Sequence, residues 1–233
     1  MGIKMDFYEI NELACQCRRD WNIDIFNPID IFSLVINKID NLTLVFIEMD
    51  DEISGACYKS NSQVIIFLNS IHNKLKQSFT LAHEIYHLKY GENVFNVCGK
   101  SDDEEEKIAD LFASCLLIPN GALNSYKKEK DIKNWTIDEI VDCECFFKVS
   151  HAEFINRLKL IGENGEFKQS VEGVYGRDHT LYEPYTKNQG VIGNYVKLTK
   201  KLFEEELISK GLHDEFLTDA FCTDLVYGDL VDS

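Results

Sequence analysis

Apolar residues recur three and four positions apart over several stretches of the chain, and this spacing predicts amphipathic helices. The first stretch runs from Phe7 to Trp21. The second runs from Ile29 to Ile39, with Pro28 suited to its first turn. Helices are further expected from near Asn73 to before Gly91, from a capping box at Ser101-Asp102-Asp103-Glu104 to Pro119, and over Trp135 to Phe147, Ser150 to Ile161, Val191 to Lys210 and Asp214 to Phe221.

Three shorter runs are dense in strand-forming residues. They are Leu42 to Glu48, Ile53 to Lys59 and Gln63 to Leu68, and short polar links of hairpin length separate them. This spacing predicts an antiparallel meander. Val64 to Leu68 is our candidate for an exposed edge strand that could bind an extended peptide, although ordinary sheet packing explains the same residues equally well.

The combined pattern predicts an α+β fold. It has a small antiparallel sheet of about three strands packed against helices, and a mainly helical C-terminal region. Glycines and Pro184 interrupt regular structure between residues 163 and 190. We therefore expect one domain over residues 1–162, followed by a loop and helical region of unknown role over residues 163–233.

The net charge and the hydropathy of the chain limit the classes of function that are compatible with the sequence. The formal net charge of −16 would repel phosphate backbones, which makes direct nucleic-acid binding unfavourable and a basic partner easier to accommodate. The amino terminus lacks the apolar stretch of a secretory signal, and no later segment approaches the roughly 18 apolar residues of a membrane span. We expect a cytoplasmic protein without membrane contact, while the oligomeric state stays open.

The eight cysteines do not form a recognisable metal or disulfide framework. Two C-x-C pairs occur, but no C-x-x-C recurs at zinc-ribbon spacing. Reduced and mostly buried thiols are therefore expected. Cys98 lies in the loop directly after the helix expected to end before Gly91, and a redox role is considered for it, although a structural thiol is the favoured interpretation.

Within that helix, His83-Glu84-x-x-His87 is the constellation with a clear chemical purpose. Residues four apart lie one turn apart on one helix face, so both imidazoles could bind one metal ion. Glu84, beside the first histidine, is placed to accept a proton from a metal-activated water. The structural alternative is a buried helix with two hydrogen-bonded histidines and a surface glutamate. A third ligand on another element would separate the two interpretations.

Two linked blocks of sequence resemble the ImmA/IrrE family of zinc metallopeptidases. The first is the histidine motif with the residues before it, from Phe79 to His87, and the second is Glu106 to Pro119, which matches the pattern E-x-x-A-[ND]-x-F-A-x-x-L-L-x-P. The segment Val149 to Leu158 also resembles the V-S-x-x-A-x-x-x-R-L element of this family. For this segment, packing is a better interpretation than DNA reading. The resemblance covers about residues 28 to 162.

The resemblance implies a zincin-like site with Zn²⁺ on His83, His87 and Glu106, and Glu84 as general base. Glu105 is the neighbouring alternative to Glu106 as ligand. Asp110, one turn after Glu106, could accept a hydrogen bond from the outward nitrogen of a ligating histidine. A side chain that stabilises the oxyanion is also expected, and the sequence does not choose among Tyr90, Tyr126, His151 and His179.

The resemblance further implies a regulatory zinc endopeptidase, of a kind often found on mobile elements or prophages, that cleaves a helix-turn-helix transcriptional repressor. The alternative is a non-proteolytic regulatory or interaction protein that keeps the metal site on the same scaffold.

Overall fold

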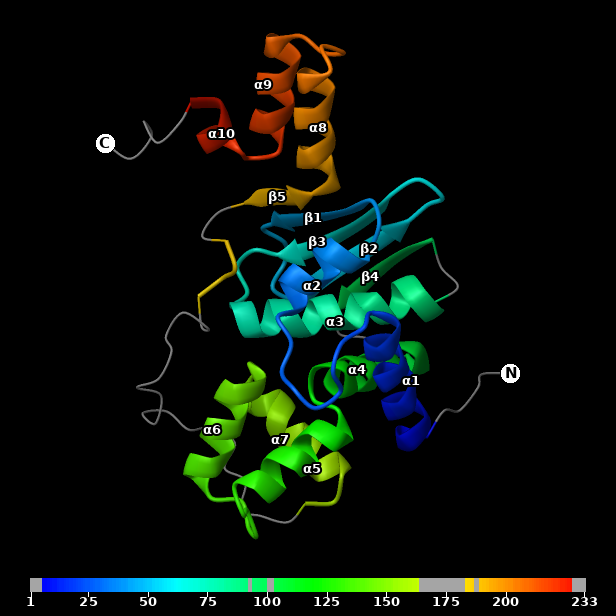
Figure 1. The fold of residues 1–233 in the computed structure, drawn as a ribbon, viewed down its shortest axis with the longest axis vertical. Coiled ribbons are helices and arrows are strands. Elements are labelled where there is room, and N and C mark those ends of the chain that lie inside the picture. The colour runs from blue at the N-terminus through cyan, green and yellow to red at the C-terminus, as the bar shows by residue number, and fades with distance from the viewer. Residues whose placement is uncertain (1–5, 92–93, 100–102, 164–182, 187–188, 228–233) are drawn as a thin grey trace.

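The computed structural model describes residues 6–91, 94–99, 103–163, 183–186 and 189–227, and these parts form an α+β fold, as expected (Figure 1). The sheet has five strands in the order β4-β2-β3-β1-β5. The strands are β1 (Leu42–Ile47), β2 (Ile53–Lys59), β3 (Val64–Asn69), β4 (Phe95–Gly99) and β5 (Gly190–Gly193). The helices are α1 (Phe7–Asp20), α2 (Ile31–Lys38), α3 (Lys74–Tyr90), α4 (Glu104–Leu117), α5 (Asn120–Glu129), α6 (Ile137–Phe147), α7 (His151–Leu160), α8 (Asn194–Glu204), α9 (Lys210–Asp219) and α10 (Thr223–Tyr227).

The predicted antiparallel meander is wrong in its first pairing. β1 runs parallel to β3, and β2 lies on the other side of β3, antiparallel to it. The buried side chain of Asn69, at the end of β3, explains this arrangement. Its amide donates to the carbonyls of Met49, Asp50 and Ile53, so the β1–β2 connection wraps around the end of β3 and cannot close a hairpin.

The sheet is also larger than the three strands expected. β3 is central, so Val64 to Leu68 is not an edge strand, and β4 and β5 form the two edges. β4 occupies a stretch expected as a polar loop. β5 takes the first residues of a segment expected as one helix from Val191 to Lys210, because Val191 and Ile192 pair with β1.

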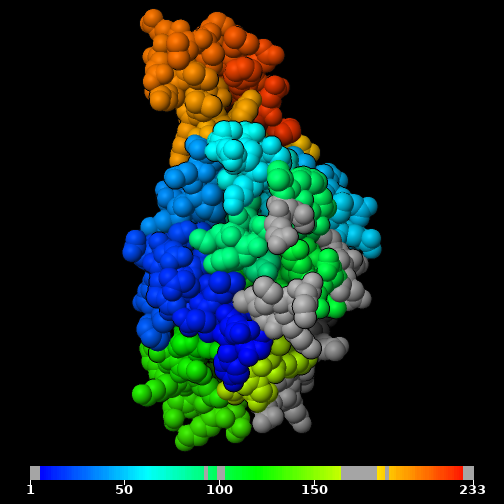
Figure 2. Space-filling view, turned by 90° about the vertical axis from the view of Figure 1, so that its right-hand side faces the viewer, coloured from blue at the N-terminus to red at the C-terminus, as the bar shows by residue number. Residues whose placement is uncertain are grey.

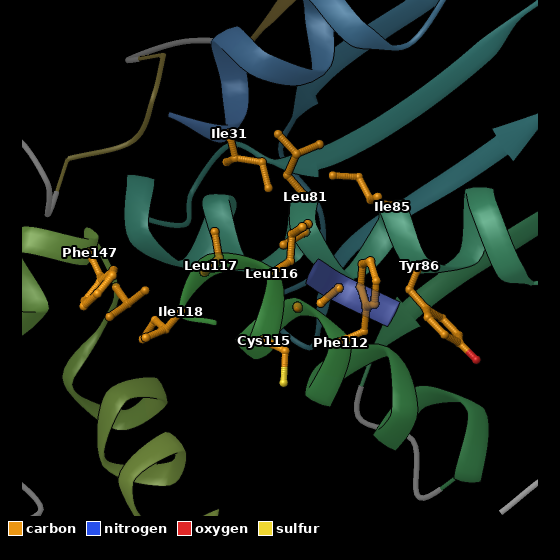
Figure 3. Packing of buried hydrophobic residues seen from close by; sticks show 14 of the residues in the cluster. Ile31, Leu81, Ile85, Tyr86, Phe112, Cys115, Leu116, Leu117, Ile118 and Phe147 are labelled. Atoms are coloured by element: carbon orange, nitrogen blue, oxygen red, sulfur yellow. The ribbon is translucent and has the colours of Figure 1, made fainter. Parts of the chain in front are cut away.

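Helix α3 lies across one face of the sheet and forms the centre of the core (Figure 1). It begins and ends as expected, with the side chain of Asn73 accepting from the Lys76 amide and Gly91 at its C-terminal cap. Figure 3 shows apolar side chains of α3 and α4 meeting between these helices. This core includes Leu81, Ile85, Phe112, Leu116 and Leu117, all of which are almost completely buried.

Helix α4 starts later than predicted. Asp103 is its N-cap and Glu104, Glu105 and Glu106 fill its first turn, where the helix dipole favours acidic residues. Ser101, the N-cap of the expected capping box, lies outside the described residues. The end of α4 is held by two fully buried arginines: Arg18 donates to the carbonyls of Leu116 and Leu117, and Arg157 donates to that of Ile118.

Helices α6 and α7 begin at capping boxes on Thr136 and Ser150 and pack into the core through Phe147, Phe154 and Leu158. The sequence did not indicate α5, which begins directly after Pro119. Among the described residues, no helix combines the length and apolar character needed to cross a membrane. All eight cysteines lie within the described residues without a disulfide between them, and six are buried, as expected for most of the thiols.

Helices α8 and α9 project from one end of the molecule, beyond β5, as the orange lobe in Figure 2. The helix expected up to Lys210 ends at Glu204, and α9 starts separately with its N-cap at Ser209. Most of the interrupted stretch expected between residues 163 and 190 lies outside the described residues.

Candidate metal centre

Two neighbouring helices bring the predicted metal-site residues together. α3 and α4 pack along one another, so that His83 and His87 on α3 face the first turn of α4. Glu106 stands in that turn. His83, Glu84 and His87 are all buried, since the helix carrying them is covered by the sheet on one side and by α4 on another.

Four donor atoms converge between these helices. Nε2 of His83 lies 3.1 Å from Nε2 of His87. The Glu106 carboxylate spans both rings, with Oε2 3.2 Å from Nε2 of His83 and Oε1 3.2 Å from Nε2 of His87. Ligand atoms placed tetrahedrally at about 2.0–2.1 Å from one zinc ion are separated by about 3.3 Å. The observed separations therefore fit the edges of such a site.

The electrostatics of the cluster favour a cation. Burial lowers the pKa of His83, but its hydrogen bonds to Asp110 and Glu106 outweigh this effect and raise the pKa to about 9. The pKa of His87 is lowered by burial and by the charge of His83. The carboxylates therefore stabilise positive charge in the space between the two rings. Without a bound cation, this charge has to be carried by a proton on the buried imidazole. Imidazole and carboxylate donors arranged in this way could hold a divalent metal ion such as Zn²⁺.

Asp110 and Glu105 lie on the outer sides of the two rings. Oδ1 of Asp110 is 2.8 Å from Nδ1 of His83. Because an ionised carboxylate can only accept, Nδ1 of His83 donates, which leaves Nε2 of the neutral ring free to bind a metal. Oε1 of Glu105 is 3.5 Å from Nδ1 of His87, on the side away from Glu106, so the geometry favours Glu106 over Glu105 as the third ligand.

Glu84 is completely buried, and neither of its carboxylate oxygens accepts a hydrogen bond of ordinary geometry from the described residues. Burial raises its pKa, and the neighbouring Cys98 thiol, His83 and the Cys57 thiol only partly offset this effect. A buried carboxylate without fixed partners is able to take up a proton from a nearby donor. This environment differs from the surface glutamate of the structural alternative.

Strands β2 and β4 add residues to the site that the histidine motif does not indicate. The Asn96 amide donates to Oε1 of Glu106 at 3.2 Å and thereby fixes that carboxylate. Cys98 lies on β4 rather than in a loop, and its Sγ lies within 4.8 Å of the donor atoms of His83, His87 and Glu106. Gly55 leaves room for Glu84, because a Cβ at this position would stand 3.2 Å from Oε1.

A cavity of about 430 Å³ opens beside His83. Its wall is formed by α3, β2, β4 and the start of α7, and α4 contributes Asp110. The described lining residues are Ser54, Asn73, Lys76, Phe79, Thr80, His83, Cys98, Asp110, Ser150, Ala152, Glu153 and Asn156. The cavity therefore leaves the His83 side of the site accessible from outside.

The residues considered for oxyanion stabilisation do not line this cavity where they are described. Tyr90 packs against Tyr86 and Phe112, and Tyr126 packs against Phe146 and Phe147. The ring of His151 is hydrogen-bonded to Glu144 instead. His179 lies outside the described residues.

Comparison with known families adds an independent result. The family model described as the IrrE N-terminal-like domain (Peptidase_M78) matches residues 40–159, which is more than half of the 233-residue chain. The matched region contains His83, Glu84, His87, Glu106 and Asp110. No curated protein matches the chain.

Proposed function

The chain belongs to the IrrE N-terminal-like family of peptidases, and on this premise we propose that it is a zinc-dependent endopeptidase. The observation that carries the proposal is the convergence of Nε2 of His83, Nε2 of His87 and the Glu106 carboxylate at mutual separations of 3.1–3.2 Å, beside the buried carboxylate of Glu84. In this proposal the two histidines and Glu106 hold the metal.

A bound Zn²⁺ would supply Lewis-acid chemistry, acidifying water and polarising a peptide carbonyl. Glu84 accepts the proton of the attacking water on a carboxylate oxygen and returns it to the leaving amine. Its raised pKa suits this cycle, since a base that is too weak would not remove the proton and one that is too strong would not return it. Asp110 accepts from Nδ1 of His83 and so holds the neutral ring in the tautomer whose Nε2 can bind the metal, and Asn96 orients Glu106.

The outer edge of β4 supports binding of an extended peptide. Among the described residues, β4 has a partner strand on one side only, β2, and it carries two residues of the site. Phe95 and Val97 on this strand are exposed. A substrate segment that added to this edge would satisfy its unpaired backbone groups and cover these apolar side chains.

A helix-turn-helix transcriptional repressor is the substrate that we propose. Two points support this choice: the family resemblance, and a net charge of −16, which favours approach of a basic protein. The proposed setting is derepression of genes on a mobile element or in a stress response, in the cytoplasm. Direct contact with nucleic acid is no part of the proposal.

The test compares zinc content and repressor cleavage in wild type and Glu84→Gln. The candidate substrate is a purified helix-turn-helix repressor encoded beside this gene, and cleavage is followed by mass spectrometry. Glu84→Gln should retain zinc and lose cleavage by roughly 10²–10⁴-fold, the contribution of a general base. Glu104→Gln, at an exposed position of α4, is the matched control and should cleave normally. Stoichiometric zinc without cleavage by wild type would instead favour the non-proteolytic metal-binding regulator.

A further inference from the structure

Cys98 places a sulfur donor at the metal site, and the proposed hydrolysis does not use this donor. Its side chain is buried, and its Sγ shares a group of mutually close donor atoms with His83, His87 and Glu106, all within 4.8 Å of one another. Thiolate is a preferred ligand of Zn²⁺, and the two histidines with Glu106 fill only three of four tetrahedral positions.

The strand register turns the thiol towards the metal site. Cys98 pairs with Gly55, and Asn96 pairs with Cys57, so Asn96 and Cys98 lie on the same face of β4. The same amide that orients Glu106 also approaches Sγ of Cys98, with Nδ2 of Asn96 at 3.9 Å. One side chain therefore holds both Glu106 and the thiol at the site.

A second buried group points to the same place. The Glu84 carboxylate has no hydrogen-bond partner of ordinary geometry among the described residues, and the Cys98 thiol is its neighbour. Cys98 thus lies between the metal position and the residue proposed as general base.

We propose that Cys98 is the fourth ligand of the metal in a resting state of the protein, where its sulfur occupies the position that water needs for catalysis. This inference rests on the proposed metal site. On entering this state the S–H bond would break, solvent would take up the proton, a metal–sulfur bond would form and the displaced water would leave intact. The resting state therefore removes the nucleophile.

The observed conformation lies close to this state. Sulfur at about 2.3 Å and nitrogen at about 2.0 Å from one zinc ion are separated by about 3.5 Å in a tetrahedral site. The upper limit of 4.8 Å for the cluster means that Sγ has to approach its neighbours by little more than an ångström. Rotation of a single short side chain and a small movement of the edge strand β4 are sufficient for such a shift.

X-ray absorption spectroscopy of the zinc-loaded full-length chain tests the inference independently of catalysis. Wild type should show one sulfur at about 2.3 Å together with nitrogen and oxygen at about 2.0–2.1 Å. The sulfur contribution should be lost in Cys98→Ser and in Cys98→Ala, while Cys222→Ser, next to the opposite edge strand β5, should retain it. The cobalt-substituted protein should lose its sulfur-to-metal charge-transfer band in the same two variants.

The outcomes separate this inference from the proposed function. Stoichiometric zinc in wild type with only nitrogen and oxygen neighbours overturns the role of Cys98 and leaves the metallopeptidase proposal standing. A sulfur neighbour that persists in both Cys98 variants also overturns it, because another thiol then supplies the ligand. A wild-type chain that takes up no zinc overturns both proposals.

Discussion

The hydrogen bond between Asp110 and His83 gives the sharpest test of how the polypeptide prepares the metal site. Asp110→Asn keeps the shape of the side chain and an oxygen that can accept from Nδ1 of His83, but it removes the negative charge. The variant should still fold, because Asp110 is largely exposed and contributes no apolar contact to the core. Its zinc affinity should fall.

The size of the effect follows from the environment of the bond. Hydrogen bonds to charged groups contribute about 1.5–3 kcal/mol, and removing such a partner of a metal-bound histidine typically weakens metal binding by 10–100-fold. The Asp110 side chain is 60% exposed, so water screens its charge and compensates for part of the loss, whereas the His83 side chain is only 7% exposed. We therefore expect the lower end of that range, about ten-fold, or about 1.4 kcal/mol.

The assay is a competition titration of zinc between the protein and a chromophoric chelator at physiological salt. Glu105→Gln serves as a graded comparison: its oxygen is 3.5 Å from Nδ1 of His87, so its effect should be less than about three-fold. Glu104→Gln removes a charge from the same helical turn without contacting either histidine and should leave the affinity unchanged. Zinc affinity of Asp110→Asn equal to that of Glu104→Gln would refute a positioning role for Asp110.

Two further predictions concern stability. Gly55→Ala should lower the free energy of unfolding by about 1–3 kcal/mol, measured by urea denaturation, because the new Cβ would stand 2.6 Å from Cγ2 of Thr80 and 2.8 Å from the carbonyl oxygen of Phe67. Gly211→Ala, which meets only the Ser209 hydroxyl at 3.8 Å, is the control and should not destabilise. Burial raises the pKa of Glu144 from its ordinary value of 4.5 to about 7, so the folded state holds this proton more tightly and its stabilising effect is lost as pH rises through that window. Wild type should therefore lose stability relative to Glu144→Gln between pH 4.5 and 7 at saturating zinc, and parallel pH profiles of the two proteins would contradict this assignment.

The helices that carry the proposed ligands could be located from the sequence because their signals are local. Asn73 and Gly91 mark the ends of α3, and the spacing of His83 and His87 needs only one helical turn to put both rings on one face. The placement of Glu106 beside the two histidines does not follow from a local sequence signal. It was expected from the resemblance alone, and the packing of α4 on α3 now provides its physical cause.

Strand pairing could not be predicted from the same kind of signal. Hairpin-length links suggested that β1 pairs with β2, but the pairing depends on Asn69, whose side chain binds carbonyls 16 to 20 residues earlier in the sequence. β5 joins the sheet from the far end of the chain, and a pairing over such a separation leaves no periodic signal in either segment. A run of strand-forming residues identifies a strand, but it does not identify the strands with which that strand pairs.

The sequence pattern did not predict β4, and the reason is related to the position of this strand over the candidate metal site. A strand over a core normally turns its apolar residues inward, whereas β4 exposes Phe95 and Val97 and turns Asn96 and Cys98 to the site, so its alternation is inverted. The inversion follows from what the strand covers: its inner face meets imidazole, carboxylate and thiol groups rather than the core. Among the described residues no strand pairs with the outer edge of β4, and a peptide added there, as proposed above, would place its own side chains beside Phe95 and Val97. The feature that hid β4 in the sequence is therefore the one that places Asn96 and Cys98 at the candidate metal site, and it also exposes the apolar side chains on which the proposed peptide binding rests.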